Sequence, residues 1–180
     1  MSSSEFDTVP NGAYNTIKPW KVNIPQQRLD DLTAVLRLTP LAPPIYENSQ
    51  GDWHFESGVF DWRKHEAYIN TFPHFKAQVH DETLSNTFDI HFVALLSSRK
   101  DAIPIVFLHG WPGSFLEFLP ILETLRSRYK SASDDLPYHL TAAGLPGYAF
   151  SSARPTDMNF TTDDVARIFD RLVLSPTTSA

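Results

Sequence analysis

A short stretch in the middle of the chain combines an apolar run, a sharp turn and a helix start. Residues 103–118 read IPIVFLHGWPGSFLEF. The apolar run between Pro104 and Gly110 predicts a buried strand of a parallel sheet. Ser114, with Glu117 three residues later, predicts a capping box that opens a helix. Backbone N–H groups at such a strand-to-helix junction are free to bind a negative charge that develops during a reaction. The stretch therefore predicts one part of an active site, the part that stabilises an oxyanion.

The composition is that of a globular protein with a neutral to acidic surface. The 180 residues are 42% apolar and 13% aromatic, which is enough for one domain with a sizeable core. Fifteen basic and 21 acidic residues leave a net charge of −6, and no block of Lys or Arg suggests a nucleic-acid or polybasic membrane surface. The absence of cysteine excludes disulfides, thiolate catalysis and cysteine-ligated metals. We therefore expect no nucleic-acid partner.

The sequence shows no targeting or metal-binding signal. Residues 1–20 lack both a basic region and a continuous apolar stretch, and no run of 18 apolar residues occurs. We therefore expect no transmembrane segment and a cytoplasmic location. Three of the seven histidines, His65, His74 and His80, are close in sequence but lack the i, i+4 pairing and the carboxylate that a zinc site needs. We expect surface or hydrogen-bonded histidines, no metal and no organic cofactor.

Apolar periodicity and capping residues predict the elements that position the turn. Asp61 is the expected N-cap of one helix, and Thr161 with Asp164 forms the capping box of another. Alternating strands and helices favour parallel pairing with right-handed crossovers. The predicted helices cover 25–39, 62–72, 114–128 and 162–172, and the predicted strands cover 87–97, 103–108 and 138–142.

Four segments together resemble a known family. They are FDWRKHEAYINTFPHF, IHFVALLSSRKDAIPIVFLHGWPGSFLEFLPIL, LPYHL and LPGYAFSS. In this order they are similar to the N-terminal part of epoxide hydrolases of the microsomal type, which have the α/β-hydrolase fold. The resemblance runs from about residue 17 to about residue 172. It implies a carboxylate nucleophile that opens an epoxide to a covalent ester, and a histidine with an acidic partner that activates water. It also implies two cap-domain tyrosines that assist ring opening.

The resemblance assigns a role to the turn at 109–112. Trp111 matches the position whose backbone N–H faces the oxyanion formed during ester hydrolysis, and its indole would line the substrate pocket. His109, Gly110 and Pro112 match the residues that shape the turn. Its sharpness also suggests a cis peptide bond between Trp111 and Pro112.

The expected fold class is α/β, as a partial α/β-hydrolase fold. A helical N-terminal meander over 17–86 is followed by the first strands and helices of a mostly parallel sheet over 87–172. Residues 1–16 are expected to form a mobile arm, and residues 173–180 an unrelated tail.

The residues that would complete the reaction are not found in the sequence. The nucleophile of this fold sits in an elbow of the type G-x-nucleophile-x-G, and no two glycines here are four apart. Gly110 and Gly113 are three apart, as are Gly144 and Gly147. The nucleophile, its acidic partner, the water-activating histidine and the cap tyrosines are therefore expected beyond residue 180. The activity of these 180 residues alone stays open.

The leading functional hypothesis is the N-terminal portion of an epoxide hydrolase, with a role in detoxification and a small hydrophobic epoxide as substrate. An esterase of the same fold is an alternative, because a serine elbow would change the reaction. A catalytically inactive fragment that acts as an interaction module is the other alternative. Such a module would form a homo-oligomer or pair with a full-length relative through the strand at 103–108.

Overall fold

The computed structural model describes residues 6–10, 16–40, 46, 60–129 and 136–173. Contacts divide the chain into two units. One comprises residues 22–71, and the other comprises residues 1–21 together with 72–180. The larger unit carries the turn at 109–114.

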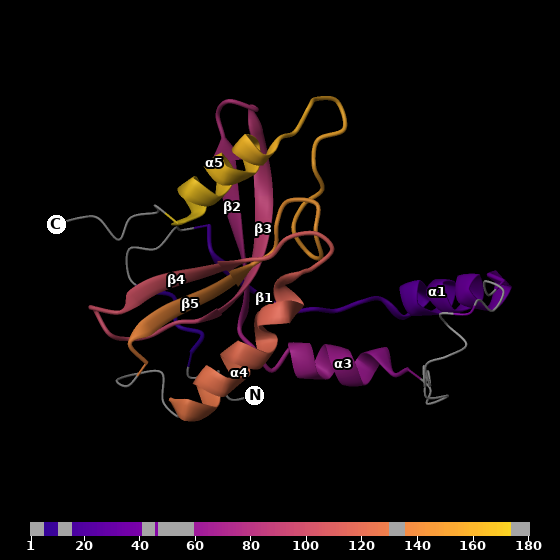
Figure 1. The fold of residues 1–180 in the computed structure, drawn as a ribbon, viewed down its shortest axis with the longest axis horizontal. Helices are drawn as coiled ribbons and strands as arrows, with labels where there is room; N and C mark the ends of the chain where they lie inside the picture. Colours follow the sequence, from indigo (N-terminus) through magenta and orange to yellow (C-terminus); the bar gives the residue numbers. More distant parts are fainter. Residues whose placement is uncertain (1–5, 11–15, 41–45, 47–59, 130–135, 174–180) are drawn as a thin grey trace. The chain divides into compact units, whose positions relative to one another are not determined.

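A five-stranded mixed sheet forms the larger unit (Figure 1). The strand order is β1-β2-β3-β5-β4, and β3 is antiparallel to both of its neighbours, whereas β4 and β5 are parallel. This order leaves β4 at an edge of the sheet within the described residues. The strands are β1 (Lys18–Trp20), β2 (His74–Asp81), β3 (Asn86–Leu95), β4 (Ile103–Leu108) and β5 (Tyr138–Ala143).

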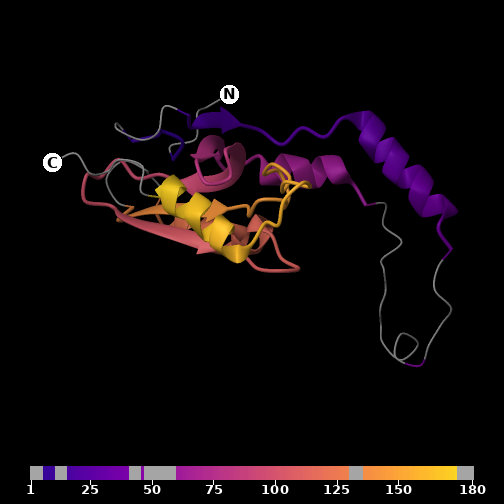
Figure 2. The same cartoon turned by 90° about the horizontal axis from the view of Figure 1, so that it is seen from above.

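One face of the sheet packs against α5 (Thr162–Val173). Residues directly opposite in register share a face, so Phe75 of β2, Phe92 of β3 and Ala143 of β5 lie on this side. Ile168 and Phe169 of α5 complete the same buried cluster. Figures 1 and 2 show α5, in yellow, lying against the sheet. The period-two alternation of β3 thus places its apolar side chains on the sheet face that packs against this helix.

The opposite face packs against the segment that follows the turn. The 3₁₀ helix η1 (Phe115–Phe118) leads directly into α4 (Leu119–Arg128). The buried Phe115 ring contacts the rings of His74 and His91, which occupy this second face of β2 and β3. Phe118 stacks on Phe107 of β4, with ring centroids 5.2 Å apart. The turn and the second sheet face are therefore joined by η1.

The smaller unit contains α1 (Gln26–Leu38) and α3 (Trp62–Ile69). The buried Glu66 carboxylate of α3 accepts hydrogen bonds from Ile24 N at 2.7 Å, from Trp62 Nε1 at 3.2 Å and from Arg63 at 2.6 Å. Burial alone would raise the pKa of Glu66, but these hydrogen bonds outweigh it and lower the pKa. Asn70 likewise bonds both backbone groups of Val22. Side-chain bonds from α3 thus hold the chain that enters α1.

The structure confirms most of the expected elements. Asp61 caps α3, and both capping boxes form, at Ser114 with Glu117 and at Thr161 with Asp164. The helix predicted over 25–39 forms as α1, but its apolar side chains Leu32, Val35 and Leu36 are each more than half exposed. No helix among the described residues is long and apolar enough to cross a membrane.

Three expectations need correction. The helical spacing predicted up to Phe72 ends at Ile69, and Pro73 is followed by strand β2, which the sequence interpretation missed. Parallel pairing holds for β4 with β5 but not for β3. Part of the predicted mobile arm packs on the sheet, since Phe6 is buried and its carbonyl accepts Leu96 N at 3.1 Å. The strands β1 and β2 fall within the predicted meander over 17–86, and the predicted tail over 173–180 lies almost wholly outside the described residues.

Candidate active site

The turn predicted to bind an oxyanion lies directly after β4. Gly113 N donates to Gly110 O at 2.7 Å, which closes a tight turn around Trp111 and Pro112. The peptide bond between Trp111 and Pro112 is cis, as the sequence suggested. The Trp111 side chain is 84% exposed. The turn therefore presents its central residue outward and not into the sheet.

The backbone N–H of Trp111 is the predicted donor. Within the described part of the chain, no hydrogen bond of this N–H to a protein acceptor is present. An N–H that took part in the sheet ladder would not be free for a substrate oxygen. The conformation of the turn thus leaves the donor open.

The exit of the turn is fixed by the capping box. Ser114 Oγ accepts Leu116 N at 3.3 Å, and the Glu117 carboxylate accepts Ser114 N at 3.2 Å. The same carboxylate lies so close to Gly113 that a Cβ there would collide with it. A side chain at Gly113 would therefore displace the Glu117 carboxylate from the capping box, which is a reason for glycine distinct from any elbow.

The entry of the turn is fixed by His109, which is buried. Its Nε2 accepts the backbone N–H of Leu145 at 3.2 Å. An accepting Nε2 places the ring proton on Nδ1, which lies 3.4 Å from Gly110 O. The ring also contacts Tyr148, with centroids 5.0 Å apart. His109 therefore joins the turn to the loop over 144–152.

Two adjacent serines attach that loop to β3. Ser151 Oγ accepts His91 N at 3.0 Å and donates to Gly144 O at 2.8 Å, while Gly144 N donates to His91 O at 2.9 Å. Ser152 Oγ accepts Asp89 N at 2.9 Å in the same manner. Beyond the end of β5, the serine hydroxyls thus satisfy the β3 backbone N–H groups that a strand would otherwise satisfy. Both serines lie in the segment LPGYAFSS that resembles the family, but no role was predicted for them from the sequence.

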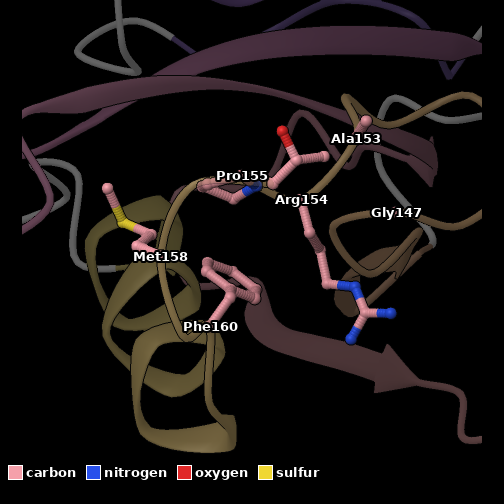
Figure 3. Close-up of a pocket in the computed structure, with 7 residues that line it drawn as sticks. Gly147, Ala153, Arg154, Pro155, Met158 and Phe160 are labelled. Carbon is pink, nitrogen blue, oxygen red and sulfur yellow. The ribbon is translucent and has the colours of Figure 1, made fainter.

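A pocket of about 400 Å³ is lined mostly by residues 153–160, which follow this loop in the chain (Figure 3). None of the four predicted turn residues lines it. Its lining residues are Gly147, Ala153, Arg154, Pro155, Thr156, Met158 and Phe160. The pocket and the predicted oxyanion turn are therefore formed by different residues.

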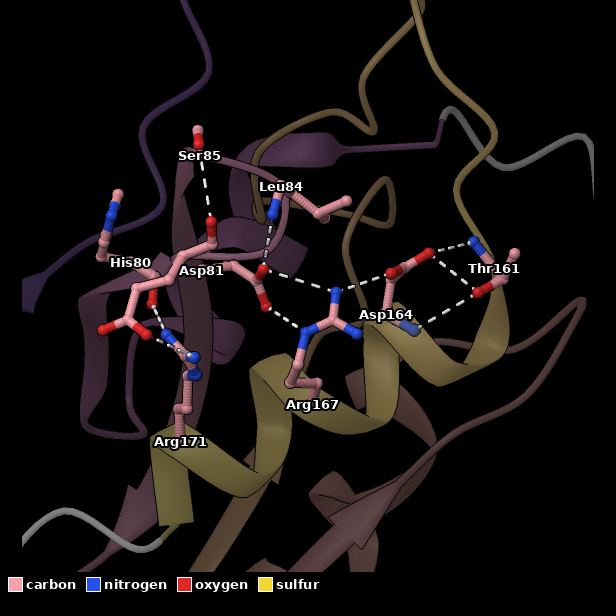
Figure 4. A network of polar contacts seen from close by, with 9 residues as sticks. His80, Asp81, Leu84, Ser85, Thr161, Asp164, Arg167 and Arg171 are labelled. Atoms are coloured by element: carbon pink, nitrogen blue, oxygen red, sulfur yellow. Dashed lines mark hydrogen bonds and ion pairs between the residues drawn. The ribbon is translucent and has the colours of Figure 1, made fainter.

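A network of charged side chains holds α5 on the sheet (Figure 4). The fully buried Asp81 carboxylate at the end of β2 accepts Arg167 Nε at 2.7 Å, and Arg167 also reaches Asp164 at 2.6 Å. Burial by itself would raise the pKa of Asp81, but Arg167 and the Leu84 N–H outweigh it and lower the pKa. For Asp164, hydrogen bonds from the Thr161 N–H and from Arg167 lower the pKa to about 2. Both carboxylates thus have structural roles.

The three histidines that are close in sequence lie on two different elements. His65 lies on α3, whereas His74 and His80 lie on β2, and the described residues contain no group of three or more metal-ligating side chains. His74 instead bonds His91, an arrangement that the sequence interpretation missed.

Comparison with known proteins identifies the family. A family model described as epoxide hydrolase N terminus matches residues 17–118, more than half of the chain and including the turn. The chain belongs to the epoxide hydrolases. A second model, described as alpha/beta hydrolase fold, matches residues 103–178 and confirms the expected fold class.

Epoxide hydrolases from a fungus, an insect and a mammal are similar to this chain. The structure of Aspergillus niger epoxide hydrolase superposes with a TM-score of 0.80 and 43% identity, covering 94% of this chain and 46% of that one. Juvenile hormone epoxide hydrolase from the silkworm Bombyx mori has a TM-score of 0.66 and 25% identity, over 91% and 44%. Epoxide hydrolase 1 of Sus scrofa is 32% identical over 88% of this chain and 37% of its own length. The chain thus spans less than half the length of these epoxide hydrolases.

Proposed function

We propose that this chain forms the N-terminal part of an enzyme that hydrolyses an epoxide to a vicinal diol, and that the Trp111 N–H stabilises the oxyanion of ester hydrolysis. The match of the epoxide hydrolase N-terminal model over residues 17–118 carries the proposal. The open Trp111 N–H supports its second part, because no acceptor within the described residues competes for it.

In the proposed reaction a carboxylate outside this chain attacks one carbon of the epoxide. The carbon–oxygen bond of the ring breaks, the ring oxygen takes up a proton, and an ester forms. A histidine outside this chain takes one proton from water as the water oxygen adds to the ester carbonyl, which gives an oxyanion. Collapse of the oxyanion breaks the ester carbon–oxygen bond, and the second water proton passes to the departing alkoxide, so that the diol and the carboxylate are released. The proton held by the histidine replaces the one taken up by the ring oxygen. A backbone donor to such an oxyanion is worth roughly 3–4 kcal/mol. The chain's contribution is therefore to hold one donor in place while other residues do the bond-making.

The substrate class follows from the turn as part of the same proposal. The exposed indole of Trp111 offers an apolar surface next to the donor. A small hydrophobic epoxide would bury part of that surface, with a gain of about 25 cal/mol per Å² of apolar area. A cytoplasmic location and a role in detoxification belong to the proposal as well, and fractionation of the source cells tests the first of them.

A chimera tests the proposed function. Residues 6–173 replace the matching segment of Aspergillus niger epoxide hydrolase, which is similar over 94% of this chain. We expect the chimera to convert styrene oxide to its diol, whereas the relative without its N-terminal segment should not. A folded chimera that forms no diol would contradict the proposal.

The esterase alternative is separated by reading the next codons of the locus. An aspartate between the elbow glycines supports epoxide hydrolysis, and a serine supports ester hydrolysis. The interaction-module alternative is favoured by one observation, the edge position of β4 with Ile103 and Leu108 more than half exposed. Co-purification of the chain with a complete hydrolase, together with an inactive chimera, would support that alternative instead.

A further inference from the structure

Two buried histidines form a pair on the sheet face beneath the turn. His74 Nδ1 lies 2.9 Å from His91 Nε2, and the two side chains are 3% and 0% exposed. Aromatic rings surround His91, with centroid distances of 5.1 Å to Trp20, 4.8 Å to Phe115 and 5.3 Å to Phe150. The pair is therefore closed off from water on several sides.

The hydrogen bonding of the pair favours neutral rings. His91 Nδ1 is buried and has no hydrogen-bond partner in the described structure. If His91 Nε2–H donates to His74 Nδ1, only an acceptor lone pair is left unsatisfied. A protonated His91 would add a second N–H donor with no acceptor, which is costly in an apolar site. The structure thus accommodates His91 only in its neutral form.

The electrostatic surroundings act in the same direction. Burial, together with positive charge on His74 and Lys76, lowers the pKa of His91 to about 3. His74 and Lys76 face His91 from β2, and half-buried Asp89 lies two positions earlier on β3. The other elements packed against His91 present Trp20, Phe115 and Phe150, which carry no charge.

His91 is tied to both ends of the turn. At the exit, its ring packs on Phe115, the first residue of η1. At the entry, its carbonyl accepts Gly144 N at 2.9 Å, and the next residue, Leu145, donates to His109 at 3.2 Å. A change at His91 therefore reaches the segment 109–114 from two directions.

We propose that His91 is a positioning residue whose neutral ring holds both ends of the turn, and that proton uptake by the His74–His91 pair loosens the turn at acidic pH. The role of the turn in oxyanion binding rests on the proposed function, but the coupling between protonation of the His74–His91 pair and the order of the turn does not. An epoxide hydrolase built in this way loses order at its donor in acid before the rest of the sheet unfolds.

The expected pH window follows from linkage. An open state in which His91 meets water has an ordinary histidine pKa near 6.5, and the closed state has a pKa of about 3. The open state therefore binds one more proton between these values, and the free energy of opening falls as pH falls. The population of the open state should rise about tenfold per pH unit in this range.

Hydrogen exchange of the 180-residue chain tests the proposal. Sub-micromolar protein is studied between about pH 6.5 and pH 4.5, above the range in which Asp164 of α5 titrates. After correction for intrinsic exchange, we expect opening of 109–118 to increase about tenfold per pH unit. Opening of 162–173, on the other sheet face, should stay constant. Equal pH dependence in both segments, or no protection of 109–118 at the upper pH, would overturn the proposal.

Two variants assign the effect. His91→Gln keeps a group that can bond His74 but cannot take up a proton, and its exchange at 109–118 should lose the pH dependence. His80→Gln is the matched control, because His80 lies on β2 but is exposed, and it should behave as the unsubstituted chain. A pH dependence that persists in His91→Gln would overturn the assignment. If the amides of 162–173 exchange without protection in His91→Gln, that variant has not folded, and His74→Gln is used in its place.

The exchange experiment and the chimera experiment can fail independently of each other. A chimera that forms no diol, together with the expected exchange pattern, would leave the His91 coupling intact and remove the epoxide hydrolase proposal. An active chimera whose 109–118 exchange shows no acid dependence would do the reverse.

Discussion

Leu145 donates its backbone N–H to Nε2 of His109 at 3.2 Å. This bond joins the turn after β4 to the loop after β5, which are 36 residues apart in the sequence. It also fixes the ring proton of His109 on Nδ1, toward the carbonyl of Gly110. The conformation of the turn at Trp111 therefore depends on a loop that lies outside the turn.

Removal of the Ser151 hydroxyl should disturb the donor from a distance. Ser151→Ala leaves His91 N and Gly144 O without their partner, next to the Leu145–His109 bond. A small displacement of a catalytic group costs up to about a hundredfold in rate, and we expect a loss of roughly ten- to a hundredfold. Single-turnover kinetics of ester hydrolysis in the chimera measures it.

The neighbouring serine provides the control. Ser152→Ala removes an equivalent hydroxyl that bonds Asp89 instead of His91. Its loss of stability should be similar, about 1 kcal/mol as for a typical hydrogen bond, without the slower ester hydrolysis. Equal kinetic effects of the two substitutions would show that the loop acts only through stability.

Loss of Arg167 should destabilise the sheet unit strongly. Arg167→Gln leaves the fully buried Asp81 carboxylate without its cation. An uncompensated buried charge is expected to lower the free energy of unfolding by about 2–4 kcal/mol. Denaturant unfolding measures the change. Arg171→Gln, on the same helix, removes exposed contacts to the His80 carbonyl and to Glu82 and should cost much less, because neither leaves a buried charge. A loss as small as that of Arg171→Gln would contradict the role of Asp81.

The same network predicts a loss of stability in strong acid. The pKa of Asp164 is lowered to about 2 in the folded chain, so the unfolded chain takes up the proton first as pH falls. The stabilisation by Asp164 is complete above about pH 4 and is lost as pH approaches 2. Asp164→Asn should remove this part of the pH dependence in thermal unfolding curves. An unchanged curve below pH 4 would be inconsistent with the assignment.

The edge strand β4 should drive self-association. Ile103 and Leu108 are 58% and 53% exposed on a strand that pairs on one side only within the described residues. Unpaired apolar edges favour strand addition, and a lysine opposes it. Leu108→Lys should therefore reduce the apparent mass of the chain at micromolar concentration in light scattering. Leu36→Lys, on the equally exposed α1, should not change it. Monomeric behaviour of the unsubstituted chain would contradict this prediction.

The sequence predicted elements where one local signal dominates. Capping side chains at Asp61, Ser114 and Thr161 act within three residues, and all of them form as expected. The alternation in β3 likewise reflects one buried face, since Phe88, Ile90 and Phe92 all lie in the α5 core cluster. Local rules of capping and period two were sufficient there.

Non-local pairing explains what was missed. The helix α3 ends at Ile69, before Phe72, and strand β2 begins directly after Pro73. β2 is stabilised by its full register with β3 rather than by its own periodicity. Polar residues such as His74 and Lys76 on one face hide the strand signal. The partner of His74 is 17 residues away, so no local pattern indicates the buried pair.

The turn itself was predicted from its sequence, but its supports were not. Trp111 and Pro112 were identified by motif, and the cis bond was anticipated. Ser151 and Leu145 act through backbone groups brought close by the fold, and backbone donors leave no residue-type signal. Support of the site was therefore visible only in three dimensions.

The most direct test of the account is the rate of ester hydrolysis in the chimera when the Trp111 N–H is removed. Trp111→Pro deletes the donor, whereas Trp111→Ala removes the indole and keeps it. We predict that Trp111→Pro slows ester hydrolysis by about 10²–10³ and leaves ester formation unchanged, so that the covalent intermediate accumulates. Trp111→Ala should retain most of the hydrolysis rate. Ester hydrolysis at an unchanged rate in folded Trp111→Pro would contradict the claim that this N–H stabilises the oxyanion.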